Sequence, residues 1–338
     1  MRLIFFGSGA FGIPTLAHLA KSGVHDIGAV ITQPDKPAGR GGRLTPTPIA
    51  AWAAEHLPKV PVLKPPKVNA PEVVAEIHKL AVAPSAPSHP TSDIPHPTFV
   101  VIAFGQKLSP RLLEGVFAIN LHASLLPRWR GAAPINAAIL GGDTETGNSI
   151  ITLADRMDAG LILAQTDPPL PIDLLITAGE LHDKLAQEGP ILVDRVLAQH
   201  AAGSLSARHQ SEAEVTIATK LSKADGYIDF HQPADFLRRQ VHALTPWPGV
   251  TTQLHTAPDA SAIPLKLLRV RSGPPSAPGT RHESGTILDP SRGVISCANH
   301  TTLEIIELQP AGKRPMDWAS FARGRPIPAG SRLISADA

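Results

Sequence analysis

The sequence predicts an α/β domain with a mostly parallel sheet, followed by a smaller domain that is a β-barrel or sandwich. The chain of 338 residues is long for one domain, so two are expected. Strand and helix patterns alternate before Gly203, which is typical of a parallel sheet with helices on both faces. After Gly203, short apolar alternations separated by Gly, Pro and Asp turns favour a barrel or sandwich. We place the domains at residues 1–204 and 205–338.

The individual elements follow from the spacing of apolar residues. Short apolar runs bounded by turns predict strands, and apolar residues at helical spacing predict helices. The strands expected in the first domain are Arg2–Phe6, Ile27–Thr32, Phe99–Ala103, Ala118–His122, Asn148–Leu153 and Leu161–Thr166. The helices expected there are Ile13–Ser22, Pro48–His56, Ala70–Leu80, Pro134–Leu140 and Ala178–Ala201. In the second domain a helix at Pro233–Leu244 precedes strands at Thr251–His255, Pro264–Val270, Gly285–Leu288, Gly293–Cys297 and Leu303–Leu308.

Two proline-rich segments interrupt the pattern of the first domain. Ala83–Thr98 contains five prolines and is predicted to be an exposed insertion, because proline disrupts helices and central strands. Gln33–Pro48 is rich in Gly, Pro and basic residues and lies between a strand and a helix. We expect a long loop there, of the kind that often carries function.

Composition excludes several classes of protein. Hydrophobic residues make up 43% of the chain, yet no apolar run approaches the ~20 residues of a membrane helix, and the first residues resemble no signal or transit peptide. Cys297 is the only cysteine, so neither an internal disulfide nor a cysteine-based zinc site can form. This composition fits a cytoplasmic protein that enters no membrane, and we also expect a monomer that uses no metal.

The net charge of +2 is unevenly distributed along the chain. Residues 205–338 hold 15 Lys/Arg and 12 Asp/Glu, whereas residues 1–204 hold 16 and 17. A mildly basic second domain is compatible with RNA contact, and it is equally compatible with an ordinary solvated surface.

The segment Gly7–Gly12 has the G-x-G-x-x-G spacing of a dinucleotide-binding turn between a strand and a helix. Such a site also needs an acidic residue at the end of the second strand, about 20 residues further on. That strand ends at Thr32, and the next acid, Asp35, follows in a loop. We therefore expect these glycines to form a tight turn or to let the backbone approach a different ligand.

Asn120 and His122 are the strongest candidates for catalysis. Side chains two apart on a strand share a face, so these two project together while Ile119 and Leu121 enter the core. Ligands bind at the carboxyl ends of strands in open parallel sheets, and an amide beside an imidazole predicts acid–base chemistry. Asp158 is the candidate carboxylate that orients the imidazole, with an ordinary turn-forming Asp as the alternative.

A serine hydrolase is disfavoured by the sequence around Ser124. This residue follows His122 closely, but no G-x-S-x-G elbow surrounds it.

The pattern Asn120-x-His122-x-Ser124-Leu125-Leu126-Pro127, with Asp158 further along, resembles the folate-dependent formyltransferase family. Segments in both domains, in matching order, resemble its methionyl-tRNA branch: Thr32–Gly41, Arg128–Ile135, Lys220–Asp229, Pro246–Gly249 and Pro310–Lys313. The resemblance covers almost the whole chain except the insertions. Phe104, where the family often has Tyr, and Gly42-Arg43, where two lysines are common, depart from the family pattern.

The resemblance implies a Rossmann-type first domain and an OB-like β-barrel as the second, tRNA-binding domain. It implies formyl transfer from 10-formyltetrahydrofolate to the amino group of initiator methionyl-tRNA, as used in translation initiation. The catalytic trio would be Asn120, His122 and Asp158. The folate would contact Ser124, Leu125, Leu126 and Pro127, and its pterin pocket would be lined by Val101, Ile102, Phe104 and Gly105. The tRNA would contact Lys36, Arg40 and Arg43.

Two questions stay open at this level. A small amine, such as an amino sugar-nucleotide, is the alternative acceptor, and the basic second domain and the loop bearing Arg40 favour tRNA over it. Arg128 and Arg130 would neutralise either the glutamate tail of the folate or RNA.

Overall fold

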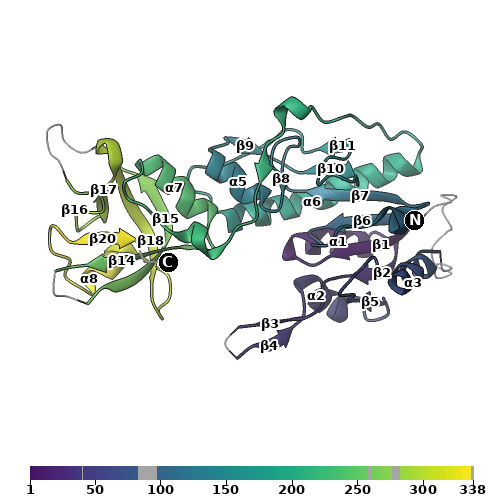
Figure 1. The fold of residues 1–338 in the computed structure, drawn as a ribbon, viewed down its shortest axis with the longest axis horizontal. Helices are drawn as coiled ribbons and strands as arrows, with labels where there is room; N and C mark the ends of the chain where they lie inside the picture. Colours follow the sequence, from purple (N-terminus) through teal and green to yellow (C-terminus); the bar gives the residue numbers. More distant parts are fainter. Residues whose placement is uncertain (40, 83–96, 258–260, 276–281, 336–338) are drawn as a thin grey trace. The chain divides into compact units, whose positions relative to one another are not determined.

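The computed structural model describes residues 1–39, 41–82, 97–257, 261–275 and 282–335. Arg40 and most of the proline-rich segment Ala83–Thr98 lie outside the described residues. The chain forms two compact units (Figure 1). Unit 1 comprises residues 1–130, 147–170 and 182–216, and unit 2 comprises residues 131–146, 171–181 and 217–338. Both units are discontinuous in sequence, and the boundary between residues 204 and 205 stays a prediction.

Unit 1 is built around a seven-stranded sheet in the order β11-β10-β7-β6-β1-β2-β5. Its strands are β1 (Arg2–Gly7), β2 (Asp26–Ile31), β5 (Val62–Leu63), β6 (Thr98–Ile102), β7 (Phe117–His122), β10 (Ser149–Thr152) and β11 (Ile162–Gln165). The strands from β5 to β7 pair in parallel, and β10 and β11 form an antiparallel edge. Counted along the chain, the parallel strands stand in the order third, second, first, fourth, fifth, which is the Rossmann-type order. The expected mostly parallel sheet is confirmed.

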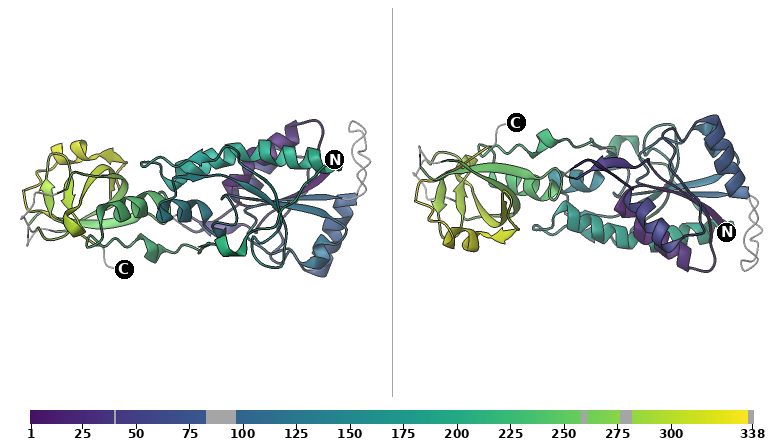
Figure 2. Two further views of the ribbon diagram at one scale, coloured as in Figure 1. Left: turned by 90° about the horizontal axis from the view of Figure 1, so that it is seen from above. Right: turned by 90° about the horizontal axis from the view of Figure 1, so that it is seen from below.

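Helices cover both faces of this sheet (Figure 2). They are α1 (Ile13–Lys21), α2 (Pro48–His56), α3 (Pro71–Val82), α4 (Pro110–Leu113) and α6 (Ala178–Ala201). One face buries Phe6, Phe99 and Val101 with Ile77 of α3. On the other face, a Cβ added at Gly189 of α6 would lie 2.7 Å from a methyl carbon of Leu121, so α6 packs directly on β7.

Unit 2 contains an antiparallel sheet in the order β16-β17-β18-β15-β14-β20. Its strands are β14 (Val250–His255), β15 (Ile263–Ser272), β16 (Ile287–Asp289), β17 (Val294–Ser296), β18 (Thr302–Pro310), β19 (Met316–Asp317) and β20 (Arg332–Ser335). A bridge between Thr286 and Arg332 joins its two ends, so the sheet closes into a barrel. Helix α7 (Ala234–Ala243) packs Leu237 and Val241 into the barrel core. The expected small barrel is confirmed.

The remaining elements are short. The strands are β3 (Lys36–Ala38), β4 (Arg43–Thr45), β8 (Arg130–Gly131), β9 (Glu145–Thr146), β12 (Leu170–Pro171) and β13 (Ile217–Ala218). The helices are α5 (Pro134–Gly141) and α8 (Trp318–Arg323). Helix α5 belongs to unit 2, where the Asn136 amide donates to the carbonyl of Ala243 at 2.6 Å.

His242 of α7 is fully buried in unit 2 and is held as a neutral ring. Its Nε2 accepts from the Val270 backbone N–H at 3.1 Å, so Nδ1 is the donor to the Leu174 carbonyl, also at 3.1 Å. Burial, followed by the charges of Arg238 and Arg269, lowers the pKa of His242 from 6.5 to about 4.

We expect this histidine to make unit 2 less stable in mild acid. Its folded-state pKa is depressed, so its contribution is fully present above pH 6.5 and is lost as the pH falls toward about 4. The free energy of unfolding should drop by up to about 3 kcal/mol across that window. Denaturant titrations of the wild type and His242→Gln at several pH values measure this contribution. An equal pH slope in the two proteins would contradict the prediction.

Candidate active site

The carboxyl ends of β1, β6 and β7 lie side by side because these strands pair in parallel. Phe6 stands opposite Val101, and Val101 stands opposite Asn120. The chain turns to opposite faces after β1 and after β6, and ligands of open α/β sheets bind at such a switch point. The candidate site therefore forms along the carboxyl edge of the parallel strands. Ser8, the segment after β6, and His122 all lie at this edge.

Asn120 and His122 lie on one face of β7, while Ile119 and Leu121 are buried on the other. His122 is 6% exposed and Asn120 is half-buried. Within the described chain, the Asn120 side chain makes no hydrogen bond. Its amide is therefore available to a ligand.

Both ring nitrogens of His122 face acceptors. Nε2 lies 2.8 Å from the carbonyl oxygen of Trp129, and Nδ1 lies 3.6 Å from Oδ2 of Asp158. A neutral imidazole has one N–H, and the shorter contact assigns it to Nε2. Nδ1 then carries the free lone pair, and a proton that arrives there lies against the Asp158 carboxylate. The arrangement can accept a proton and hold it.

The loops that form this site carry strained backbone. Ala103 after β6, Trp129 after β7 and Asp158 after β10 have φ values of 47°, 61° and 52°. Non-glycine residues seldom adopt this left-handed region, and such residues concentrate at functional sites. Within the described part of unit 1, these three are the only non-glycine residues with positive φ.

The expected folate-contacting loop, residues 124–127, is held by hydrogen bonds between side chains and backbone. Ser124 is buried and its hydroxyl donates to the Arg128 carbonyl at 2.6 Å. The N–H of Leu126 donates to the Ser149 hydroxyl at 3.0 Å, and its carbonyl accepts from Gln165 at 2.9 Å. Leu125 and Pro127 are half-buried, and the Leu126–Pro127 bond is cis.

The expected pterin-pocket residues differ in exposure. Val101, Ile102 and Phe104 are buried, and Phe104 packs edge-on against Phe6 with ring centroids 5.4 Å apart. Gly105 is exposed, with φ of 83°. The backbone around Gly105, rather than the three buried side chains, is therefore the surface that this segment offers to a ligand.

The glycine-rich turn after β1 is filled by the protein's own groups. The Ser8 hydroxyl donates to the Phe104 carbonyl at 3.0 Å and accepts from the Gln33 N–H at 3.1 Å. A Cβ at Gly7 would lie 3.1 Å from the carbonyl oxygen of Ile102, so this glycine allows close packing of two strands. The Ser8 hydroxyl thus joins this turn to the segments that follow β6 and β2.

The basic segment after β2 contains a hairpin, β3–β4, where the sequence indicated a long loop. Lys36 pairs with Thr45 and Ala38 with Arg43, so Lys36 and Arg43 share one face of the ribbon, and both are exposed. Arg40 lies outside the described residues. The strands are three residues each, too short for an alternation to be recognised in the sequence.

Sequence reasoning missed Gln210, and it expected Arg130 to neutralise the glutamate tail of the folate or RNA. Arg130 is 3% exposed, and its guanidinium donates to Gln210 and to Glu212, both at 2.9 Å. Arg130, and then Arg156, hold the pKa of Glu212 below its usual value. Arg130 is thus committed to an ion pair, whereas Arg128 is exposed, 5.1 Å over the Trp129 ring. Gln210 lies in a polar segment with no periodic signal.

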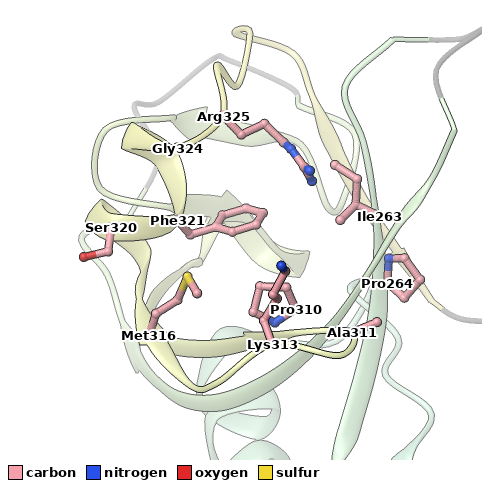
Figure 3. A pocket seen from close by; sticks show the side chains of 10 residues that line it. All are labelled: Ile263, Pro264, Pro310, Ala311, Lys313, Met316, Ser320, Phe321, Gly324 and Arg325. Atoms are coloured by element: carbon pink, nitrogen blue, oxygen red, sulfur yellow. The ribbon is translucent and has the colours of Figure 1, made fainter.

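Unit 2 has a cavity of about 410 Å³ lined by apolar side chains and two cations (Figure 3). Lys313 and Arg325 enter it from opposite sides of the Phe321 ring, and Met316, Pro310 and Ile263 are among the other residues that line it. Within the described residues, neither cation forms an ion pair. The sequence indicated Lys313 through Pro310–Lys313 but gave no signal for Arg325.

Metal sites, membrane helices and reactive thiols would each leave a recognisable arrangement among the described residues. No group of three or more His, Cys, Asp or Glu there is arranged to hold a metal ion. No helix in that part of the chain is long and apolar enough to span a membrane. Burial raises the pKa of the Cys297 thiol to about 12, which leaves it a poor nucleophile.

Comparison with known proteins identifies the class. Residues 1–197 match the family model described as formyl transferase, and residues 220–326 match the model of the formyl transferase C-terminal domain. The chain belongs to the formyl transferase family.

Its sequence relatives carry a more specific name. The methionyl-tRNA formyltransferase of Symbiobacterium thermophilum is 39% identical over 100% of this chain and 97% of its own length. That of a Bradyrhizobium species is also 39% identical, over 98% of this chain and 99% of its own length.

Solved structures show the same fold at lower identity. The N-formyltransferase of Helicobacter canadensis, in complex with folinic acid and dTDP-3-aminofucose, has a TM-score of 0.60 and 13% identity. The match covers 90% of this chain and 98% of that one. A sugar 3N-formyl transferase, in the presence of dTDP and 5-N-formyl-THF, has a TM-score of 0.61 and 14% identity over 93% and 99%.

Gly160 lies too close to the backbone of Thr152 to accept a side chain. A Cβ there would lie 1.7 Å from the Thr152 carbonyl oxygen, so Gly160→Ala must displace the turn that carries Asp158. We expect a loss of about 1–3 kcal/mol in the free energy of unfolding. Gly324→Ala, where the nearest atom is 3.7 Å away, is the matched control. Denaturant unfolding compares the two variants, and equal stability would show that the turn tolerates a side chain.

Proposed function

We propose that this protein transfers the formyl group of 10-formyltetrahydrofolate to the amino group of initiator methionyl-tRNA. The product is the formylmethionyl-tRNA used in translation initiation, and the protein acts in the cytoplasm as a monomer. The observation that carries the proposal is the arrangement of His122 between the Trp129 carbonyl and Asp158, beside the available amide of Asn120. Full-length relatives at 39% identity that bear this enzyme's name support the choice of acceptor.

The residues fit the chemistry that a formyl-carrying folate requires. When bound, the folate supplies the formyl carbon that the amine attacks. The Asn120 amide donates to the formyl oxygen as negative charge develops there, and one such donor is typically worth ~10²–10³ in rate. Neighbouring exposed backbone at Ala103 and Gly105 would hold the carrier.

Proton movement is assigned to His122. Nδ1 takes the proton that the attacking amine loses and returns it to the departing nitrogen. The Asp158 carboxylate, 3.6 Å from Nδ1, stabilises the charged ring during this exchange, and the Trp129 carbonyl holds Nε2. An α-amino group has an ordinary pKa of about 7.7–8, so this attack needs no activation beyond deprotonation.

Contacts with tRNA are assigned to exposed cations. Lys36 and Arg43 share a face of the β3–β4 hairpin, and Arg40 is proposed with them from the family resemblance. In unit 2, Lys313 and Arg325 flank the Phe321 ring. Cations that bracket an aromatic ring suit phosphates and an unstacked base.

Single-turnover transfer of labelled formyl tests the acceptor and the trio together. We expect rapid transfer to charged initiator methionyl-tRNA by the wild type, and rates reduced by ~10²–10⁴ in His122→Ala and ~10²–10³ in Asn120→Ala. His56→Ala, an exposed histidine on α2, is the control and should retain the wild-type rate. If the protein binds folate yet formylates only small amines, the tRNA acceptor is wrong. The alternative, an amino sugar-nucleotide, is then favoured.

Salt dependence tests the cavity of unit 2. The double variant Lys313→Ala/Arg325→Ala should bind methionyl-tRNA more weakly than the wild type. The slope of log affinity against log salt concentration should also become shallower, by about one for each phosphate that these two cations neutralise. Arg314→Ala removes a neighbouring charge that does not line the cavity and should change affinity much less. An identical salt slope in the double variant and the wild type would exclude this cavity from the tRNA interface.

A further inference from the structure

The segment 208–216 crosses both loops that face His122, and we call it the strap. The strap and the residues that it contacts around His122 all belong to unit 1. Its first anchor is Arg208, whose backbone N–H and carbonyl pair with Ile162 of β11, both at 2.9 Å. Its last anchor is Thr216, whose backbone carbonyl accepts a hydrogen bond from the Arg130 N–H at 2.9 Å. Between these anchors lies Gln210.

Gln210 holds the turn that carries Asp158. Its Nε2 donates to the carbonyl of Asp158 at 2.7 Å and to that of Gly160 at 2.8 Å. Its Oε1 accepts from Arg130 Nε at 2.9 Å. The opposite amide orientation would set oxygen against two carbonyls and nitrogen against a guanidinium N–H, so the assignment is unambiguous. One side chain therefore fixes both carbonyls at the ends of the Asp158–Gly160 turn.

Thr216 holds the other partner of His122. Its hydroxyl accepts from the Trp129 N–H at 2.8 Å, and Trp129 is the residue whose carbonyl receives Nε2 of His122. Arg130 joins the two halves, because it follows Trp129 in the chain and its buried guanidinium supports Gln210 and Glu212. The strap thus secures the acceptor on each side of the imidazole.

The strained backbone explains why such support is needed. Trp129 and Asp158 both have positive φ, and non-glycine residues keep that conformation only when their surroundings hold them there. Removing the hydrogen bonds from Gln210 would let the Asp158 turn relax away from Nδ1, while the groups that contact substrate stay unchanged.

We infer that Gln210 is a positioning residue for the acid–base pair, with Thr216 in the same role on the Nε2 side. The inference rests on the proposed function only for its activity readout. Gln210 itself touches neither Asn120 nor His122 in any contact of the described chain. Its effect passes through the backbone of Asp158 and Gly160.

Gln210→Glu is the sharpest variant, because it keeps the acceptor for Arg130 and removes the N–H groups that face two carbonyls. At saturating substrates we expect formyl transfer to slow by about 10- to 100-fold, because a small misplacement of a catalytic group costs that much in rate. The KM values for tRNA and folate should stay within about threefold of the wild-type values. Gln187→Glu makes the same change on the exposed side of α6 and should leave the rate unchanged. Thr216→Val should also slow transfer, by removing the acceptor for the Trp129 N–H.

The ring signals of His122 in nitrogen NMR spectra provide a readout that a purely structural role would not move. They are assigned by their loss in His122→Ala, and they report which nitrogen holds the proton. We expect them to shift in Gln210→Glu and in Thr216→Val but not in Gln187→Glu. A folded Gln210→Glu with unchanged His122 signals or an unchanged rate would overturn the inference.

Two further outcomes are distinguishable. If Gln210→Glu does not fold, Thr216→Val decides by the same two measurements, and wild-type values there overturn the inference. If the wild type itself does not formylate methionyl-tRNA, the proposed function fails, while the His122 signals of the variants still test the positioning.

Discussion

Strand β7 pairs with β6 in parallel and with β10 in antiparallel fashion, and the candidate active site depends on this double pairing. The parallel pairing brings His122 to the edge shared with the segment after β6. The loop after β10, which carries Asp158, starts at Thr152, opposite Ile119, and returns toward His122. Because β10 runs opposite to β7, Ser149 stands beside His122, and its hydroxyl binds the loop that follows.

The site stores strain that its surroundings must offset. Three non-glycine residues in the left-handed region cost of order 1–3 kcal/mol each. The compensating contacts are side-chain hydrogen bonds to backbone: Ser8 to Phe104, and Gln210 to Asp158 and Gly160. Such contacts satisfy carbonyls that regular structure leaves unpaired, and each fixes a loop relative to the sheet. Amide and hydroxyl side chains thus fix these loops in addition to the apolar packing of residues such as Phe104.

Most of the arginines that the structure describes in unit 2 are held in ion pairs. Arg271 and Arg292 flank Glu304 and lower its pKa, and the hydrogen bond from Arg269 contributes most to lowering the pKa of Glu180 to about 2. Such cations are partly neutralised and less available to phosphates. The excess of basic residues in the second domain therefore overstates the charge that is free to bind phosphates, and Lys313 and Arg325, which form no ion pair within the described residues, are more informative than the total charge.

The sequence by itself determined the parallel sheet, the barrel, and the shared face of Asn120 and His122, because apolar periodicity and strand alternation are local. It also indicated Asp158, first as a carboxylate that could orient the imidazole and then through the family pattern. Tertiary structure alone decided that the Trp129 carbonyl receives Nε2, and that Gln210 supports Asp158 across 52 residues of chain. The two-residue strand β5 and the hairpin β3–β4 are too short to give a period. Contacts between loops far apart in sequence have no periodicity at all, so only the folded chain reveals them.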